Sequence, residues 1–220
     1  MAYIKSFPNQ NYLIPPKITD LFSEDHVCYL IENIADNMDY SEFDNKYAGA
    51  GHPAYHPKIS LKILAMANVD GMRSSRKIAK NANENVVYIY LAEKTNPDFR
   101  TISDFRKNNP EIIENFMLQL SKFAYENGLI DLSQLMVDGS TIKANANNNR
   151  ILDEETIKKL KKYIEKEIQK GIEVDEEEDK LYGDRGMHEL PKEFNNSEKR
   201  RPIVRKIVDE INKGIKKWYS

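Results

Sequence analysis

The sequence is poor in cysteine and in long apolar runs, and each shortage excludes a class of protein. A single cysteine, Cys28, rules out an internal disulfide and with it a disulfide-rich secreted scaffold. No apolar run approaches the length of a membrane span, mean hydropathy is -0.68, and the first residues lack the apolar core of a signal peptide. We therefore expect a cytoplasmic protein with no membrane partner, and the apolar neighbours of Cys28 predict a buried thiol.

Charge is distributed unevenly along the 220 residues, although the net charge is only -2. Residues 55–109 contain 10 basic and 5 acidic residues, whereas residues 1–54 contain 3 basic and 8 acidic ones. A local basic excess is typical of a module that meets phosphates. A solvated helix surface gives the same count, so both interpretations stay open at this point.

Start and stop signals in the first half of the chain predict a helical domain. After an extended lead-in over residues 1–22, Ser23 is a candidate cap for the first helix. Pro57 opens a helix that Gly71 ends, and Ser74 begins a basic helix a few residues later. A helix, a short turn with glycine and a capped basic helix together indicate a helix-turn-helix.

Two basic clusters are the candidate DNA contacts. The first surrounds the predicted turn, and the second lies on a short helix after Pro97, for which Thr101 is a candidate cap. Arginine and lysine side chains bind phosphates, and arginine can also read guanine in the major groove. The alternative, which stays open at this point, is ordinary surface charge with salt bridges inside the chain. The candidate residues are Arg73, Arg76, Lys77 and Lys80 in the first cluster, and Arg100, Thr101, Arg106 and Lys107 in the second.

The stretch from Gln134 to Asn145 carries a clear strand signature. Apolar and polar residues alternate up to Asp138, Gly139 follows, and a second short strand begins after it. Asp138 has two interpretations, which do not exclude each other. It is a residue of a tight turn, or it is a carboxylate at a strand end that binds a divalent metal such as Mg²⁺.

The last third of the chain changes character. A charged helix over residues 153–170 and another over 203–218 are separated by an acidic run at 175–179 and a loop. Narrow apolar seams on both helices predict an antiparallel helical hairpin that stands out from the body. The acidic run has no strand pattern around it and is interpreted as solvated surface. The first seam consists of Ile157, Leu160, Ile164 and Ile168.

Four segments in order carry a family resemblance: residues 53–57 (PAYHP), 71–78 (GMRSSRKI), 97–106 (PDFRTISDFR) and 137–145 (VDGSTIKAN). Together they resemble the front half of bacterial insertion-sequence DDE transposases, in the branch with an InsH-type N-terminal domain. The resemblance implies a helical DNA-binding domain followed by an RNase H-like catalytic domain. It also implies double-stranded DNA, the terminal inverted repeats of the element, as the partner, and with it association with the nucleoid.

In that family two aspartates and one glutamate bind two Mg²⁺ ions, and Asp138 matches the first aspartate, a catalytic and metal-binding residue. The sequence reaches its end inside the charged helices without meeting the other two acids. The resemblance therefore predicts a truncated transposase that binds element ends but lacks strand-transfer activity alone. The alternative is a non-catalytic protein that oligomerises with, or inhibits, an intact transposase.

The predicted fold is mainly α. We expect the helical transposase domain over residues 23–130 and a short β-hairpin, the first strands of the RNase H-like domain, over residues 131–150. The charged helical insertion then occupies residues 151–220, and the RNase H-like domain is incomplete.

Overall fold

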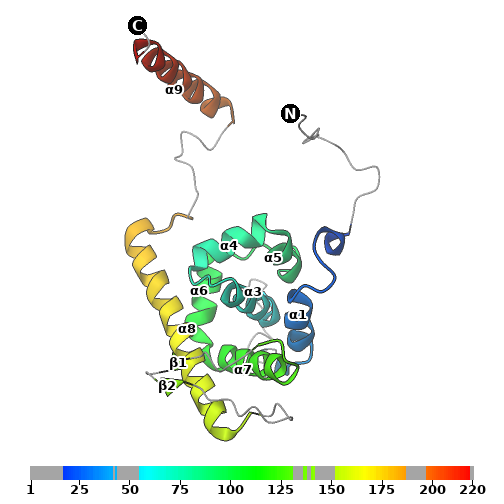
Figure 1. Ribbon diagram of the computed structural model, residues 1–220. Helices are drawn as coiled ribbons and strands as arrows, with labels where there is room; N and C mark the ends of the chain where they lie inside the picture. The colour runs from blue at the N-terminus through cyan, green and yellow to red at the C-terminus, as the bar shows by residue number, and fades with distance from the viewer. Residues whose placement is uncertain are drawn as a thin grey trace, which may run out of the picture. The chain divides into compact units, whose positions relative to one another are not determined.

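The computed structural model of the chain is mainly helical, as the sequence predicts (Figure 1). Contacts within the chain define two units, Met1–Lys180 and Leu181–Ser220. The structure describes residues 17–41, 43, 55–130, 136–137, 140–141, 152–186 and 197–218.

Helix α3 (Pro57–Val69) lies at the centre of the first unit. His56 caps its start through Nδ1. At its end Gly71 has a φ of +66°, a conformation that favours glycine, and this lets the N–H of Met72 donate to the carbonyl oxygen of Ala67 at 2.7 Å. The predicted boundaries of this helix are therefore confirmed.

Nearly every residue of α3 is buried because other helices contact it on several sides. Leu61 and Ile63 are fully buried, and each such side chain contributes about 1.5–3 kcal/mol through the apolar area it removes from water. The elements in contact with α3 are α1 (Cys28–Asp36), α4 (Ser75–Glu84), α5 (Val86–Leu91) and α7 (Pro110–Glu126), and η1 (Ile18–Leu21) and α6 (Phe99–Asn108) pack on these.

The start of α1 differs from the sequence prediction. Ser23 was expected to cap this helix, but its hydroxyl donates to Asp25 within a turn, and the helix begins at Cys28. The prediction of a buried thiol is confirmed, since Cys28 is fully buried. Burial raises the pKa of the Cys28 thiol to about 11.

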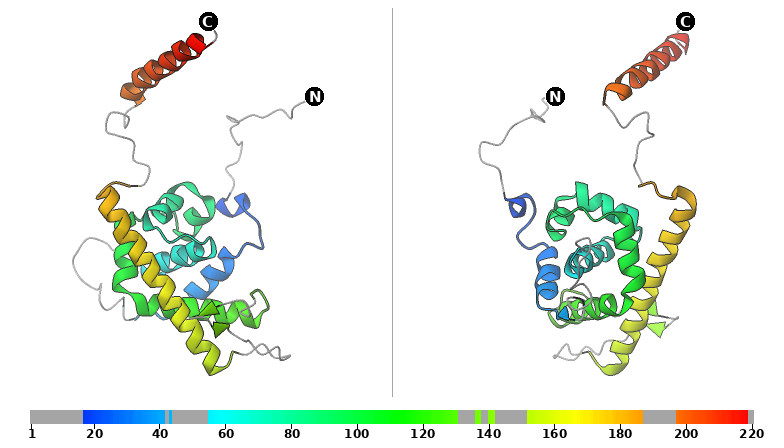
Figure 2. Two further views of the ribbon diagram at one scale, coloured as in Figure 1. Left: turned by 60° about the vertical axis from the view of Figure 1, so that its left-hand side comes forward. Right: turned by 180° about the vertical axis from the view of Figure 1, so that it is seen from behind.

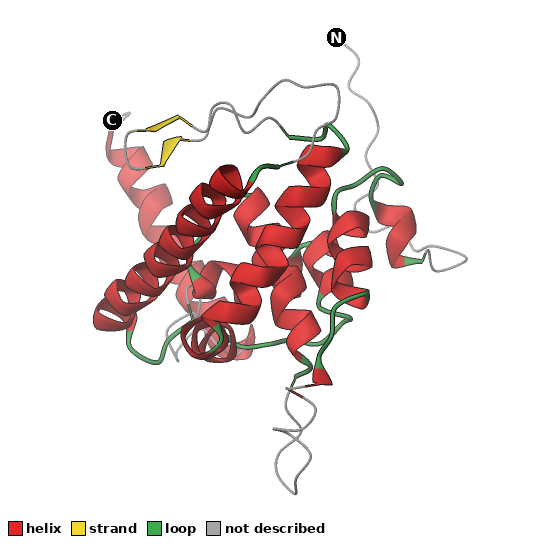
Figure 3. Cartoon of the chain, turned by 90° about the horizontal axis from the view of Figure 1, so that it is seen from below, coloured by secondary structure: helices red, strands yellow, loops and turns green. Residues whose placement is uncertain are grey.

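Strands β1 (Met136–Val137) and β2 (Ser140–Thr141) form the antiparallel pair drawn in yellow in Figure 3. Asp138, which lies between them in sequence, is outside the described residues. Two paired residues on each strand do not support an RNase H-like sheet by themselves. The β-hairpin and the RNase H-like domain therefore stay predictions.

Helix α8 (Glu154–Tyr182) packs against the helical body over residues 157–179 (Figure 2). Leu160 and Ile164 form a small core with Tyr125 of α7. The expectation that the charged helices stand out from the body is wrong for α8. The helix also continues past its predicted end and includes the acidic run at residues 175–179.

The second unit contains helix α9 (Ser197–Trp218). Val204, Ile207 and Val208 lie on one face of it, at the i, i+3, i+4 spacing of a helix, and each is 45–47% exposed. A hairpin between α9 and α8 stays a prediction. Within the described part of the chain, no helix combines the length and the apolar character that crossing a membrane requires.

Candidate functional site

The start of α4 gathers hydrogen-bond donors from two helices. Ser74 caps α4 and accepts the N–H of Lys77 at Oγ, 3.2 Å away, so the predicted cap is confirmed. Ser75 follows as the first helical residue, with an N–H that no earlier turn can satisfy. Helix α6 packs against α4 and brings Arg106 to the same place. We call Ser74, Ser75, Arg76 and Arg106 the donor set.

Asp175 of α8 binds the centre of the donor set. Its carboxylate accepts the N–H of Ser75 at 2.8 Å, the Ser75 hydroxyl at 2.6 Å and Nη1 of Arg106 at 2.7 Å. Asp175 is 3% exposed and Arg106 is 5% exposed. Burial lowers the pKa of the Arg106 guanidinium, and the adjacent Asp175 opposes that shift. A buried charge is therefore compensated by a partner from 69 residues away in sequence.

Arg76 is held in the same way by the next turn of α8. Its Nη2 lies 2.6 Å from Asp179 Oδ1, and its Nη1 lies 3.8 Å from Glu178 Oε2. The guanidinium also stacks on Phe99, 4.1 Å from the ring centroid. Ser74 donates its hydroxyl to Glu178 at 2.7 Å. Three carboxylates of one helix therefore satisfy the donor set.

Two further ion pairs flank this centre. Arg73 donates from Nε to Glu167 at 2.9 Å, and Lys107 lies 3.1 Å from Glu176. Burial acts to raise the pKa of Glu167, but hydrogen bonds from Lys170 and Arg73 outweigh it and hold that pKa below its ordinary value. The positive charge around the start of α4 is thus paired with negative charge on α8.

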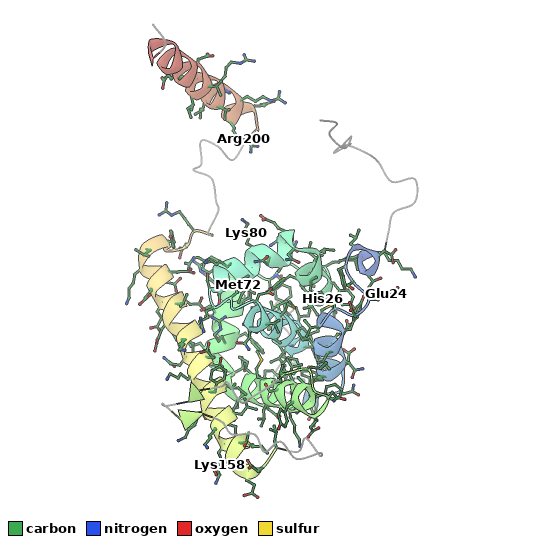
Figure 4. The ribbon with its side chains drawn as sticks, in the orientation of Figure 1. Glu24, His26, Met72, Lys80, Lys158 and Arg200 are labelled. Atoms are coloured by element: carbon green, nitrogen blue, oxygen red, sulfur yellow. The ribbon has the colours of Figure 1, made fainter. Side chains whose placement is uncertain are left out.

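The remaining predicted contacts lie outside these pairs. Lys77 and Arg100 are exposed, and Lys80, labelled in Figure 4, lies 3.5 Å from Glu84 on its own helix. The cap of α6 is Asp98, which accepts the N–H of Thr101 at 2.7 Å, so the prediction of Thr101 as the cap is wrong.

A polar cavity of about 190 Å³ lies where α4, α6 and α8 meet. Its lining contains guanidinium groups as well as carboxylates, so a charged group that enters the cavity meets positive and negative side chains. Its lining residues are Arg76, Phe99, Arg100, Ser103, Asp104, Asp175 and Asp179.

Part of this helical body is similar in sequence to a known family. Residues 16–108 match the family described as a transposase domain (DUF772). This match covers less than half of the chain, and it supports a transposase family. Searches of the curated proteins and of the solved structures found no match.

The transposase-domain match contains the whole donor set but none of its carboxylate partners, which lie on α8. The interpretation of residues 175–179 as solvated surface is wrong for Asp175, which is buried. A signal was present in the sequence. Continuing the predicted apolar seam beyond Ile168 in steps of three and four reaches Gly171, Asp175 and Glu178, so these residues share the face that meets the body.

The catalytic part of the family resemblance lies beyond this site. Asp138 is outside the described residues. Within the described ranges, no three His, Cys, Asp or Glu side chains gather as a metal ion would require. The Mg²⁺ site at Asp138 therefore stays a prediction from the resemblance.

Proposed function

We propose that the chain acts in DNA transposition and that its helical domain binds double-stranded DNA at the ends of a transposable element. The observation that carries this proposal is the match of residues 16–108 to a transposase domain. The order of α3, the glycine turn and the capped helix α4 supports it, because helix-turn-helix modules place the second helix against DNA.

The chemistry of the donor set also supports DNA binding. Protein contacts to DNA phosphates use arginine side chains, hydroxyl groups and backbone N–H groups at helix N-termini. The donor set, which α4 and α6 contribute together, supplies all three kinds within the matched domain.

Three exposed cations extend the candidate surface. Lys77 and Arg100 are exposed, and Lys107 is more than half exposed in spite of its pair with Glu176. Exposed lysine and arginine side chains are removable without a large effect on folding. They are therefore better test positions than Arg76 and Arg106, which are buried.

The test compares the native chain with the triple variant Lys77→Ala, Arg100→Ala, Lys107→Ala, by fluorescence anisotropy with labelled duplexes of the element's ends. We expect the variant to lose affinity by at least roughly tenfold at low salt. Its plot of log affinity against log salt concentration becomes shallower by about three, since each lost phosphate contact removes a slope of roughly 0.9.

The matched control removes three exposed lysines outside the transposase-domain match, as Lys122→Ala, Lys158→Ala, Lys162→Ala. It changes net charge by the same amount, so it should keep the native affinity if binding is local to α4 and α6. If both triple variants lose the same DNA affinity, net charge explains the loss, and the assignment of the binding surface to α4 and α6 is wrong. Absence of any binding by the native chain and by both variants would contradict DNA binding itself.

The alternative, an interaction protein that oligomerises with an intact transposase, is favoured by one observation. Val204, Ile207 and Val208 form an exposed apolar row on α9, and such rows mark contacts between helices. Analytical ultracentrifugation of Ile207→Glu against the native chain tests it. If both sediment as monomers at every concentration, self-association through this row is wrong.

A further inference from the structure

Residues 171–179 of α8, here called the acidic segment, bring carboxylates to the donor set at the start of α4. The carboxylate of Asp175 meets the N–H and hydroxyl of Ser75 together with Arg106, at 2.6–2.8 Å. These distances are those of charge-assisted hydrogen bonds, which phosphate oxygens form with the same donors. A carboxylate and a phosphate cannot occupy the same donors together, so DNA contact at the start of α4 requires this helix to leave.

Both halves of helix α8 form ion pairs with the body, with Glu114 and Arg73 as the partners of the first half, but the first half also buries apolar side chains against it. In the first half Leu160 and Ile164 are buried with Tyr125, and Ile168 packs on the same core. In the second half the described contacts to the body are ion pairs and hydrogen bonds, made by Asp175, Glu178 and their neighbours. The first half is an apolar anchor, while the second is held by interactions that another anion can replace.

Gly171 lies between these halves. A Cβ at this position would come within 2.9 Å of Arg106 Cζ and Nη1, so glycine is what lets the guanidinium pass close to the α8 backbone. A glycine within a helix also weakens it locally, by about 1 kcal/mol relative to alanine. The residue that admits Arg106 therefore also makes the junction between the anchor and the acidic segment the easiest place for α8 to bend.

We propose that the acidic segment is an intramolecular mimic of DNA phosphate, which covers the donor set and detaches at Gly171 when DNA binds. This inference rests on the proposed DNA-binding function. It assigns the two halves of α8 different roles. The anchor keeps the acidic segment close to α4, so its local concentration stays high, and DNA must displace it before the donor set can bind phosphates.

The test uses the full chain and a labelled double-stranded DNA oligonucleotide of mixed sequence. The release variant is Glu176→Gln, Glu178→Gln, Asp179→Asn, which keeps Asp175 opposite the buried Arg106. The matched control is Glu165→Gln, Glu173→Gln, Glu177→Gln, which removes the same charge from exposed positions of the same helix. We expect the release variant to bind DNA roughly tenfold more tightly than the native chain, and the control to bind with a clearly smaller gain.

A second measurement needs no substitution. Amide hydrogen exchange of the native chain should show that saturating DNA lowers the protection of residues 171–179 and leaves that of residues 157–168 unchanged. Unchanged or increased protection of the acidic segment in the DNA complex would overturn the inference, even if the release variant folds poorly.

The outcomes separate the two proposals. If the native chain and the release variant bind DNA with equal affinity, the acidic segment is not a phosphate mimic, but the proposed DNA binding is unaffected. Equal tightening by the release and control variants also sinks it, because net charge then explains the gain. Failure of every chain to bind DNA refutes the proposed function and the mimic together.

Discussion

Asp175 and Arg106 form a buried ion pair, 2.7 Å long, between helices that are far apart in sequence. The pair joins the transposase-domain match to a helix that lies beyond it. Two charges taken out of water are compensated only while both are present, because a single buried charge costs several kcal/mol. The pair therefore makes the position of residues 171–179 of α8 depend on the Asp175 carboxylate, while Leu160 and Ile164 hold the first half of the helix by apolar contacts.

Removing that carboxylate gives the first prediction. If α8 were fixed, Asp175→Asn would leave Arg106 buried and unpaired, at a cost of about 3–5 kcal/mol in unfolding free energy. We expect a smaller loss in urea unfolding, because the acidic segment can lift and return Arg106 to water. Hydrogen exchange of residues 171–179 should rise in the same variant.

The control for this prediction is Glu173→Gln, an exposed position of α8. This substitution should change the unfolding free energy by less than about 0.5 kcal/mol. It should leave the amide hydrogen exchange of the neighbouring residues unchanged. A full penalty in Asp175→Asn, without faster exchange in α8, would mean that the helix is rigidly part of the body.

The second prediction concerns Gly171. Alanine at this position gains about 1 kcal/mol of helix propensity, but its Cβ would meet Arg106 at 2.9 Å and must displace the guanidinium from Asp175. We expect Gly171→Ala to lower the exchange protection of residues 175–179 although it favours the helix itself. Glu173→Ala is the control, since it alters propensity on the exposed face alone. Greater protection in Gly171→Ala than in the native chain would show that Arg106 adapts without releasing Asp175.

Local signals in the sequence predict the ends of α3 and the start of α4, but they do not predict how far α8 extends or what it contacts. Pro57, Gly71 and Ser74 fix helix ends by hydrogen bonds to nearby backbone groups, so the predicted ends agree with the structure. The acidic run has no apolar periodicity of its own. The predicted seam extends to Asp175 and Glu178 and places them on the face that meets the body, but it does not identify their partners. The partners of the acidic run, Arg76 and Arg106, lie about 70–100 residues away in sequence.

The sequence indicates the basic residues of the candidate site, but it does not show that acidic residues of α8 pair with them. The basic clusters around Arg73 and Arg106 were identified from composition and spacing, but composition cannot tell a phosphate-binding surface from one already paired within the chain. Thr101 and Ser23 failed as predicted caps because an aspartate and a turn, respectively, satisfy the nearby groups.

The third prediction addresses Lys62, a fully buried lysine of α3. Its ammonium lies 2.9 Å from Glu93 and 3.7 Å from Glu32. Replacing both glutamates by glutamine leaves this charge uncompensated in the core, and we expect a loss of about 3–5 kcal/mol in urea unfolding. Adding Lys62→Met should recover most of the loss, because methionine fills a similar volume without a charge.

A matched comparison is the exposed pair of Lys80 and Glu84, where Glu84→Gln should cost about 0.3–0.5 kcal/mol. If Lys62→Met deepens the loss in the double-glutamine background, the ammonium is stabilised by something other than the two carboxylates, and the prediction fails.

The fourth prediction uses Cys28 as a reporter of unfolding. Burial raises the pKa of its thiol to about 11, above the value of about 8.5 for a free cysteine. Because the folded pKa is the higher one, the contribution of this thiol to stability is complete below about pH 8.5. It declines as the pH rises toward 11, because in this range the unfolded chain has released the thiol proton and the folded chain still holds it.

At pH 8 the buried thiol of the native chain should react slowly with a disulfide reagent, at a rate proportional to the population of opened molecules. The rate should rise with urea in step with the loss of helical circular dichroism. The same reaction in strong denaturant sets the rate of the free thiol. A fast reaction of Cys28 in the absence of urea would show that α1 opens locally without unfolding of the core around α3.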